Sequence, residues 1–458
     1  MNIVLIVVDS LRASALDAPD LPFFTRLANE SICFRRAYAT ECWTLPTHLS
    51  LFTGLLPSAH GAHFQSMAYR GTAPTIAELL AAAGYQTEVV TRNSIFDGSL
   101  PGVTRGFQKN TRILSPRAGL NPLSFILAAS KPRFRRQILS TGFFHPRQRE
   151  SLAFLQTFAH ATVPADREAL THVLQRLASA RRRQERTFVF ANLYDVHAPY
   201  SPSAESIFRL PWWSPRGLDD LARLPVVMPK LGGHRYLRAG FRMSARSRRM
   251  LRNRYRDAVR LMDAKLAAFY DAARAAGLLD DTLLIVTSDH GEAFGEHGLY
   301  LHDASVYNTH LHVPLFVHHP ARAAEPVDDV VSTRDLFHLM RAVGTGCGLN
   351  GTLLDAAARA QRPVAIAEHF HYDRLPDALP QYRQNLVAAI AGDHKVIVGA
   401  DGVRHYDLGR DPDEAWPSSG PREELDGRVR ALAVGSRIQG VVRAHLERFQ
   451  PRRAARSA

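Results

Sequence analysis

Three separated, mostly apolar runs are each followed at once by polar, metal-capable side chains. The runs are 3–8, 187–193 and 282–286, and they lead into Asp9, Tyr194-Asp195-Val196-His197 and Thr287-Ser288-Asp289-His290. Apolar runs without alternation are typical of strands buried on both faces of a parallel sheet. Ligands of open α/β sheets bind beyond the carboxyl ends of the strands, so we expect these three ends to converge on one site.

Helical patterns separate these strands. They cover 74–83, which precedes a further strand at 86–91, then 151–182 and 245–276. This order predicts an α/β fold with a large mixed, mostly parallel sheet sandwiched between helices. A helical pattern at 335–343 and strand-like runs at 363–367 and 386–398 predict a small C-terminal α+β subdomain. We expect a main domain over 1–345, the subdomain over 346–450 and a frayed tail over 451–458.

Composition says less than pattern. The 57 Lys and Arg against 43 Asp and Glu give a net charge of +14, which attracts anions. Only five of the basic residues are lysines, and the chain is rich in Arg and Ala. We therefore attribute the positive charge to the base composition of the genome and not to function. Basic stretches at about 110–150 and 201–250 interrupt the strand–helix order and are interpreted as insertions. They are either solvated loops or a cap facing an anionic substrate or lipid.

Cysteines and hydropathy indicate the compartment. Cys33, Cys42 and Cys347 have no paired spacing, so neither a disulfide framework nor a thiolate zinc site is predicted. The run 3–8 is too short to span a membrane and has no basic flank. We therefore expect a soluble, cytoplasmic protein, and leave its oligomeric state open.

The segment after Cys42 carries a candidate nucleophile. Pro46 and a helix-forming run place Thr44 near a helix N-terminus, where backbone N–H groups and the helix dipole stabilise negative charge. Thr44 or Thr47 could instead simply cap the helix. The Asp-His pair that leaves the third strand into the glycine-punctuated loop 291–298 favours the chemical interpretation, because such a loop lets the backbone approach a metal closely.

These segments resemble the sulfatase branch of the alkaline phosphatase superfamily, in the family's order from residue 3 to about 414. The resemblance is carried by Val8-Asp9-Ser10-Leu11-Arg12, 44–54, 289–298, Val313-Pro314-Leu315 and 406–414. It implies that Asp9, Asp289, His290 and the hydroxyl oxygen of Thr44 hold one divalent metal. Such an ion acts as a Lewis acid and lowers the pKa of the hydroxyl. Residues 1–345 are then a sulfatase-like catalytic domain.

Two departures from the family change the expected chemistry. Thr44 occupies the place of the Cys or Ser that becomes formylglycine, and His48 replaces the motif's Arg, so no formylglycine is expected. The nucleophile is then the unmodified Thr44 hydroxyl, which makes phosphoryl transfer at least as favourable as sulfuryl transfer. Ser10 stands where many sulfatases have a second Asp, and it is a further candidate metal ligand. With His290 present, this favours Mn²⁺ or Zn²⁺, with Ca²⁺ and Mg²⁺ still open.

The resemblance also suggests substrate contacts. His197 is our general acid, although it could merely be a histidine satisfied beside Asp195, and His302 faces the oxygens of the transferred group. His48 and Gln65 add donors to those oxygens. A second metal at Asp195, His197 and His302 is a weaker alternative, and Arg12 is expected to support the loop.

The sequence thus predicts a metal-dependent hydrolase that cleaves small anionic sulfate or phosphate/phosphonate esters through Thr44. Two alternatives remain. The same site could pass a phosphoryl or phosphoalcohol group to an acceptor other than water, or a degenerate site could leave a basic binding protein. No specific nucleic acid is expected, because the basic runs lack interleaved aromatic residues. Peripheral contact with an anionic membrane stays open.

Overall fold

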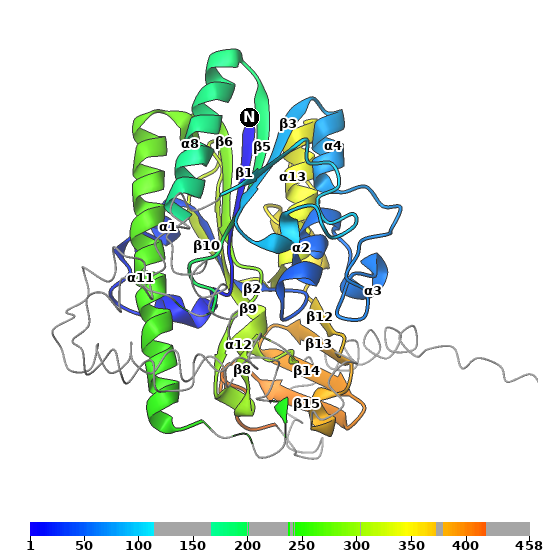
Figure 1. Cartoon of the computed structure of the whole chain (residues 1–458). Helices are drawn as coiled ribbons and strands as arrows, with labels where there is room; N and C mark the ends of the chain where they lie inside the picture. The colour runs from blue at the N-terminus through cyan, green and yellow to red at the C-terminus, as the bar shows by residue number, and fades with distance from the viewer. Residues whose placement is uncertain are drawn as a thin grey trace, which may run out of the picture.

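The computed structural model describes residues 1–113, 166–198, 200, 237–238, 241, 243–302, 304–371 and 379–417 (Figure 1). Its centre is a nine-stranded sheet in the order β10-β2-β9-β6-β1-β5-β3-β4, with β11 also paired to β2. The strands are β1 Asn2–Val8, β2 Ile32–Tyr38, β3 Tyr85–Thr91, β4 Lys109–Arg112, β5 Arg186–Leu193, β6 Thr282–Thr287, β9 His312–His318, β10 Glu325–Val327 and β11 Val331–Ser332. Only β9 runs antiparallel to its neighbours β2 and β6. The mixed, mostly parallel sheet is therefore confirmed.

Helices cover both faces of this sheet. On one side lie α1 (Pro22–Glu30), α8 (Asp166–Arg183) and α11 (Ala245–Ala275), and on the other α2 (Thr44–Thr53), α3 (Pro57–His60), α4 (Ile76–Ala82) and α13 (Leu336–Thr345) (Figure 1). Shorter helices are α12 Asn308–Leu311, α14 Ala356–Gln361, η1 Ala13–Asp17, η2 Ser94–Phe96, η4 Leu278–Asp281, η5 Glu296–Gly298, η6 Thr333–Asp335 and η7 Pro380–Tyr382. No helix among these described residues is both long and apolar enough to cross a membrane.

The central strand β1 shows why its sequence lacks alternation. Val4, Ile6 and Val8 pack into the core beneath α1, α8 and α11. Ile3, Leu5 and Val7 pack into the core on the side of α2, α4 and α13. Full burial of one such side chain contributes about 1.5–3 kcal/mol, so both faces favour aliphatic residues. The strand therefore holds the next residue, Asp9, at a fixed point of the sheet edge.

A smaller antiparallel sheet lies below the central one in Figure 1. Its strands are β12 Ala365–His369, β13 Leu386–Ala391, β14 His394–Gly399 and β15 Gly402–Asp407, in that order. One face packs against Tyr38, Leu311 and Val313 of the main domain. The predicted run 386–398 is in fact a hairpin, because Gly392, with its positive φ of 53°, begins a turn within it. A two-stranded hairpin, β7 Ala293–Phe294 with β8 Tyr300–Leu301, packs into the same core as α1, α8 and α11.

The described residues at the ends of the predicted insertions belong to regular elements. Lys109–Arg112 is strand β4 of the main sheet, and α11 already begins at Ala245, with Ser244 accepting a hydrogen bond from the N–H of Ser247. Residues 114–165 and 201–236, and the tail 451–458, lie outside the described residues. The domain boundaries stay a prediction.

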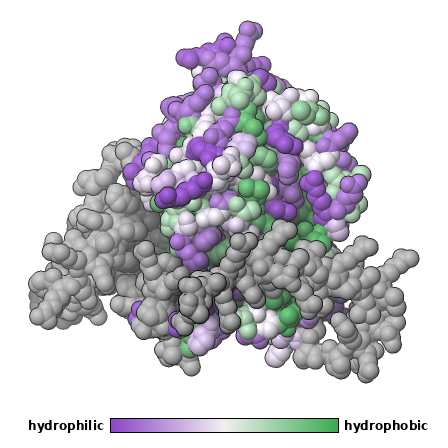
Figure 2. Space-filling model, turned by 90° about the vertical axis from the view of Figure 1, so that its right-hand side faces the viewer, coloured by the Kyte–Doolittle hydropathy of each residue, from purple (hydrophilic) through white to green (hydrophobic). Residues whose placement is uncertain are grey.

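Figure 2 shows the face on the right of Figure 1, where hydrophilic residues cover most of the visible described surface and apolar residues form small patches. Large hydrophobic residues that are exposed in the described part of the chain are Met67, Val403 and Trp416. The apolar residues of the strands and of the amphipathic helices are thus used for the core.

Candidate active site at the carboxyl ends of β1, β5 and β6

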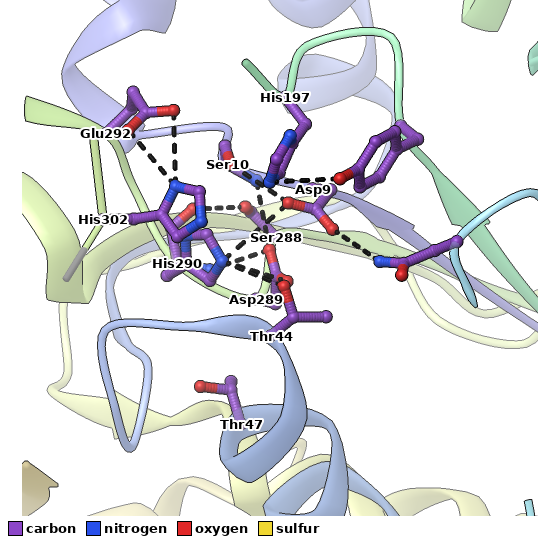
Figure 3. Close-up of polar contacts among 12 residues, drawn as sticks. Asp9, Ser10, Thr44, Thr47, His197, Ser288, Asp289, His290, Glu292 and His302 are labelled. Carbon is purple, nitrogen blue, oxygen red and sulfur yellow. Dashed lines mark hydrogen bonds and ion pairs between the residues drawn. The ribbon is translucent and has the colours of Figure 1, made fainter. Parts of the chain in front are cut away.

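The expected convergence of strand ends is present. β1 pairs in parallel with both β5 and β6, so the residues that follow the three strands lie side by side (Figure 3). The backbone N–H of Asp9 donates to the carbonyl of Leu193 over 2.8 Å, which extends the pairing of β1 and β5 to the site itself. Thr44 is the first residue of α2 and faces these strand ends from below in Figure 3.

Thr44 is not a helix cap in this structure. The N-cap residue of α2 is Trp43, and the Thr44 hydroxyl oxygen lies 3.4 Å from Nε2 of His290. Thr47, the other capping candidate, donates from its hydroxyl to the carbonyl of Glu41 over 3.2 Å and lies apart from the group in Figure 3. The N-terminal end of a ten-residue helix therefore faces the site, where its dipole favours negative charge.

His290 presents a free nitrogen lone pair to this group. Its Nδ1–H donates to the carbonyl of Gly291 over 2.9 Å, so Nε2 carries no proton in the neutral ring. That Nε2 lies 3.3 Å from Oδ2 of Asp289 and 3.8 Å from Oδ1 of Asp9. Two carboxylates, one imidazole and the Thr44 hydroxyl thus point at a common centre.

The electrostatics of this group favour a cation. Asp9, Asp289 and His290 are completely buried. Burial, reinforced by the charge of Asp9, raises the pKa of Asp289 well above its ordinary value. Burial, and next the charge of His302, lowers the pKa of His290 well below its ordinary value. Among the described residues Oδ2 of Asp289 has no hydrogen-bond partner, so the donor set fits a divalent metal held by Asp9, Asp289, His290 and Thr44.

Ser10 connects the two carboxylates. Its hydroxyl donates to Oδ1 of Asp9 over 3.0 Å, and its backbone N–H donates to Oδ1 of Asp289 over 3.1 Å. Its φ of 65° lies in the left-handed region, and Tyr255 donates from its hydroxyl to the Ser10 carbonyl over 2.8 Å. The structure thus places Ser10 as a clamp on both carboxylates, whereas the sequence suggested a metal ligand.

Asn93 and Asn192 were not singled out from the sequence, and Ser288 was named there only as one of the polar residues after the third strand. Asn93 and Asn192 donate from their amides to Oδ2 of Asp9 over 3.3 and 3.5 Å. Ser288 accepts from the N–H of Leu11 over 2.9 Å and donates to the carbonyl of His290 over 2.8 Å. The polar Asn192 inside an otherwise apolar run was the one signal in the sequence for these supporting hydrogen bonds.

His197 and His302 border the same centre. The ring of His302 lies 4.4 Å from that of His290 and 4.8 Å from that of His197, measured between centroids. His197 donates from Nδ1 to the carbonyl of Ala198 over 2.7 Å, and its Nε2 lies 3.3 Å from the Tyr194 hydroxyl. Burial lowers the pKa of His197. Both histidines therefore lie beside the metal-capable group, and their roles stay a prediction.

His302 is oriented by a residue that the sequence reasoning did not single out. Its Nδ1 donates to the carboxylate of Glu292, with distances of 3.2 and 3.4 Å to the two oxygens. Glu292 is completely buried. This carboxylate fixes which nitrogen of His302 points at the site.

His48 lies behind the site. Its Nδ1–H donates to the carbonyl of Thr44 over 2.7 Å, and its ring packs against Phe52, Phe96 and Phe190. Burial lowers its pKa to about 4, so it is a neutral ring at physiological pH. This position suits support of the first turn of α2 better than contact with substrate oxygens.

Gln65 and Asp195 lie away from the expected contacts. Gln65 is exposed and its amide donates to the carbonyl of His371 over 3.5 Å. Asp195 pairs with Arg92 at 2.7 Å and with Lys265. Its carboxylate is therefore already neutralised, and the two-metal alternative with Asp195 as a ligand does not fit this arrangement.

The sheet edge and its ligand group define an α/β protein with a buried carboxylate–imidazole–hydroxyl centre at the carboxyl ends of its strands. The family model described as Sulfatase matches residues 1–344, and the chain belongs to the sulfatase family. This confirms the resemblance seen in the sequence.

The names of similar proteins indicate different ester substrates. Human iduronate 2-sulfatase is 23% identical over 354 residues, which cover 71% of this chain and 60% of that protein. Mouse arylsulfatase K is 32% identical over 170 residues, covering 33% and 29%. The chain thus spans less than two thirds of these relatives. The crystal structure of the phosphonate monoester hydrolase of Agrobacterium radiobacter superposes with a TM-score of 0.63 and 20% identity, covering 97% of this chain and 96% of that one.

Proposed function

We propose that this protein is a metal-dependent hydrolase that cleaves small anionic phosphate, phosphonate or sulfate esters, with the unmodified Thr44 hydroxyl as nucleophile. The observation that carries the proposal is the position of the Thr44 oxygen, 3.4 Å from Nε2 of His290 and at the N-terminus of α2. Asp9, Asp289, His290 and Thr44 would hold the metal, with Mn²⁺ or Zn²⁺ favoured. When bound, that ion supplies positive charge for the threonine oxygen and for the oxygens of the transferred group.

The residues of the chain divide the remaining work. The Thr44 oxygen attacks the phosphorus or sulfur atom, its hydroxyl proton leaves to solvent, an ester to Thr44 forms, and the bond to the leaving alcohol breaks. The neutral ring of His197 keeps its one proton on Nδ1, which donates to the carbonyl of Ala198. The proton donor is therefore the imidazolium form, which gives its Nε2 proton to the leaving oxygen. His302 contributes N–H polarity from the opposite side, oriented by Glu292. Water then cleaves the ester at Thr44.

Phosphoryl and phosphonyl esters are favoured over sulfate esters. A formylglycine hydrate expels sulfate by collapsing to an aldehyde, and a threonine has no second hydroxyl for that step. The ester on Thr44 must therefore be attacked directly. The match in fold to a phosphonate monoester hydrolase is compatible with this substrate class, and the sequence similarity to iduronate 2-sulfatase keeps sulfate esters in the test.

Peptide mass spectrometry after incubation with Mn²⁺ and three p-nitrophenyl substrates tests the proposal. The substrates are the sulfate monoester, the phenylphosphonate monoester and the phosphate diester. We expect nitrophenol release from the phosphorus esters and a phosphoryl or phosphonyl adduct on the peptide containing Thr44. Sulfate release without that adduct would contradict the threonine mechanism. Turnover that requires an added alcohol would assign a transferase, and salt-sensitive anion binding without turnover would assign a binding protein.

The cell compartment is part of the same proposal. A cytoplasmic location fits three cysteines without paired spacing. Fractionation of the producing cell with an antibody to this chain tests it, and recovery from an oxidising compartment would contradict it.

A further inference from the structure

A second group of metal-capable side chains lies just before the nucleophile segment. Glu41, Cys42 and His369 are 0%, 0% and 2% exposed. Oε1 of Glu41 lies 3.2 Å from Sγ of Cys42 and 2.9 Å from Nδ1 of His369, and that sulfur and nitrogen are 3.6 Å apart. One sulfur, one nitrogen and one oxygen thus form a compact triangle. None of the three takes part in the proposed reaction.

The three donors of this triangle come from two separate parts of the fold. Glu41 and Cys42 lie in the connection between β2 and α2, two to three residues before Thr44. His369 is the last residue of β12 in the C-terminal sheet. The N–H of Glu368 donates to the carbonyl of Thr40 over 2.8 Å, which fixes the end of β12 beside this connection. The packing of the small sheet therefore sets the distance between the donors.

The separations suit a tetrahedral ion. Zinc bonds to sulfur, nitrogen and oxygen at about 2.0–2.3 Å, so the ligands of a tetrahedral zinc are roughly 3.3–3.6 Å apart. The observed separations of 2.9, 3.2 and 3.6 Å need an opening of at most about 0.4 Å to reach them. That adjustment is small for side chains on a loop and a strand end.

Charge and hydrogen bonding also favour an ion here. Without one, Oε1 of Glu41 accepts from the Cys42 N–H, the Cys42 thiol and the His369 ring, while Oε2 of Glu41 and Nε2 of His369 have no hydrogen-bond partner among the described residues. A divalent ion with one carboxylate, one thiolate and a neutral imidazole is an electrically neutral set, which a buried site tolerates better than an isolated charge.

We propose that Glu41, Cys42 and His369 form a second metal site, which binds a thiophilic divalent ion such as Zn²⁺ and is separate from the centre at Asp9 and Asp289. Binding forms a bond between the ion and Sγ of Cys42, and the thiol proton leaves to solvent. Water or Oε2 of Glu41 completes the coordination. The ion fastens β12 to the segment that carries Thr44, so its role is to position that segment.

Cobalt substitution distinguishes this site from the first one. Protein loaded with Co²⁺ should show a near-ultraviolet thiolate-to-cobalt charge-transfer band, because the first site contains no sulfur. The band should be lost in Cys42→Ser, kept in the matched control Cys33→Ser, and kept in Asp289→Asn, which removes only the first ion. Metal analysis should give one equivalent less in Cys42→Ser than in Cys33→Ser.

A measurement on the unmodified chain protects the test against misfolding of Cys42→Ser. Titration of the zinc-loaded protein with an organomercurial, with a metal-indicator dye present, should release one equivalent of ion as Cys42 reacts. If the thiols react without release of metal, or if Co²⁺ gives no thiolate band in the wild-type protein, the triangle is a hydrogen-bonded cluster and the proposal is wrong.

Discussion

The hydroxyl oxygen of Thr44 lies 3.4 Å from Nε2 of His290, on the edge of the imidazole ring that makes no backbone hydrogen bond. The two residues are 246 positions apart in the chain, and they meet because α2 begins at Thr44 and β6 ends just before Asp289. The oxygen is therefore held beside the other ligand atoms of the site.

Replacing Thr44 tests this relationship. Thr44→Ala should lower kcat/KM by about 10³-fold or more, because the attacking oxygen is gone. Thr44→Ser is the matched control, since it keeps an oxygen and should retain a measurable part of the activity and the covalent adduct. Equal activity in Thr44→Ala and the wild type would show that another group attacks.

Metal removal should affect both activity and stability. Chelation should abolish turnover, and added Mn²⁺ or Zn²⁺ should restore it. An ion at about 100 times its Kd stabilises the folded state by about 2.7 kcal/mol, so thermal unfolding should shift downward on chelation. Asp289→Asn should lose the restoration of activity and the part of the stability response that comes from this ion, whereas Asp280→Asn, at an exposed position, should keep both. An unchanged response in Asp289→Asn would place the ion elsewhere.

Proton donation by His197 predicts a dependence on the leaving group. His197→Gln should slow esters of poor leaving alcohols by about 10²–10⁴-fold and p-nitrophenyl esters much less, because nitrophenolate needs little protonation. A series of aryl phosphonates of increasing leaving-group pKa measures this. A uniform loss across the series would assign His197 to binding.

Glu292 is predicted to be a positioning residue. Removing its carboxylate frees the ring of His302, so Glu292→Ala should lower kcat by about 10²-fold with a smaller change in KM. Glu292→Gln keeps an acceptor oxygen for the His302 N–H and should lose less. If both variants change only KM, the pair binds substrate uniformly and does not position the ring for catalysis.

His60 should contribute to the decrease in the free energy of unfolding at acidic pH. Its Nδ1 accepts from the N–H of Ala62 over 3.1 Å, and its Nε2 lies 3.1 Å from the carbonyl of Pro46. Burial lowers its pKa from 6.5 to about 3. The folded state therefore excludes a proton that the unfolded chain binds, so the free energy of unfolding is constant above pH 6.5 and falls below it, until about pH 3.

The expected loss attributable to this histidine is up to about 1.4 kcal/mol per pH unit below 6.5, or about 2 kcal/mol at pH 5. Urea unfolding of the wild type and His60→Gln at several pH values measures it. The variant should show the flatter profile, and parallel profiles would contradict the assignment.

The strands of the central sheet could be predicted from the sequence where both of their faces are buried. Residues 3–8 and 282–286 read as strands from hydropathy alone. The strands β2 and β9 did not, because Arg35 and Arg36 lie in β2, and Pro314 with terminal histidines interrupts β9. Their formation depends on pairing between strands far apart in sequence, which local pattern does not record.

The site was predictable to the same extent. Asp9, Asp289 and His290 follow recognisable strands, so their meeting could be inferred. The clamp by Ser10 and the support by Glu292 could not, because they depend on backbone conformation and tertiary contacts. Spacing rules also gave no hint of the group formed by Glu41, Cys42 and His369, since its histidine lies 327 residues beyond the cysteine.

The contact between Ser10 and Asp289 joins residues 279 positions apart, just beyond the ends of β1 and β6, which are direct neighbours inside the sheet. A chain still being synthesised therefore contains only half of the residues of this centre until β6 has been made and inserted between β1 and β9. Such long-range pairing is slow, so high-affinity uptake of the catalytic ion should be among the last events of folding. Under the proposed function, a chain that has not completed its central sheet would lack the full ligand set for the ion and would therefore lack activity.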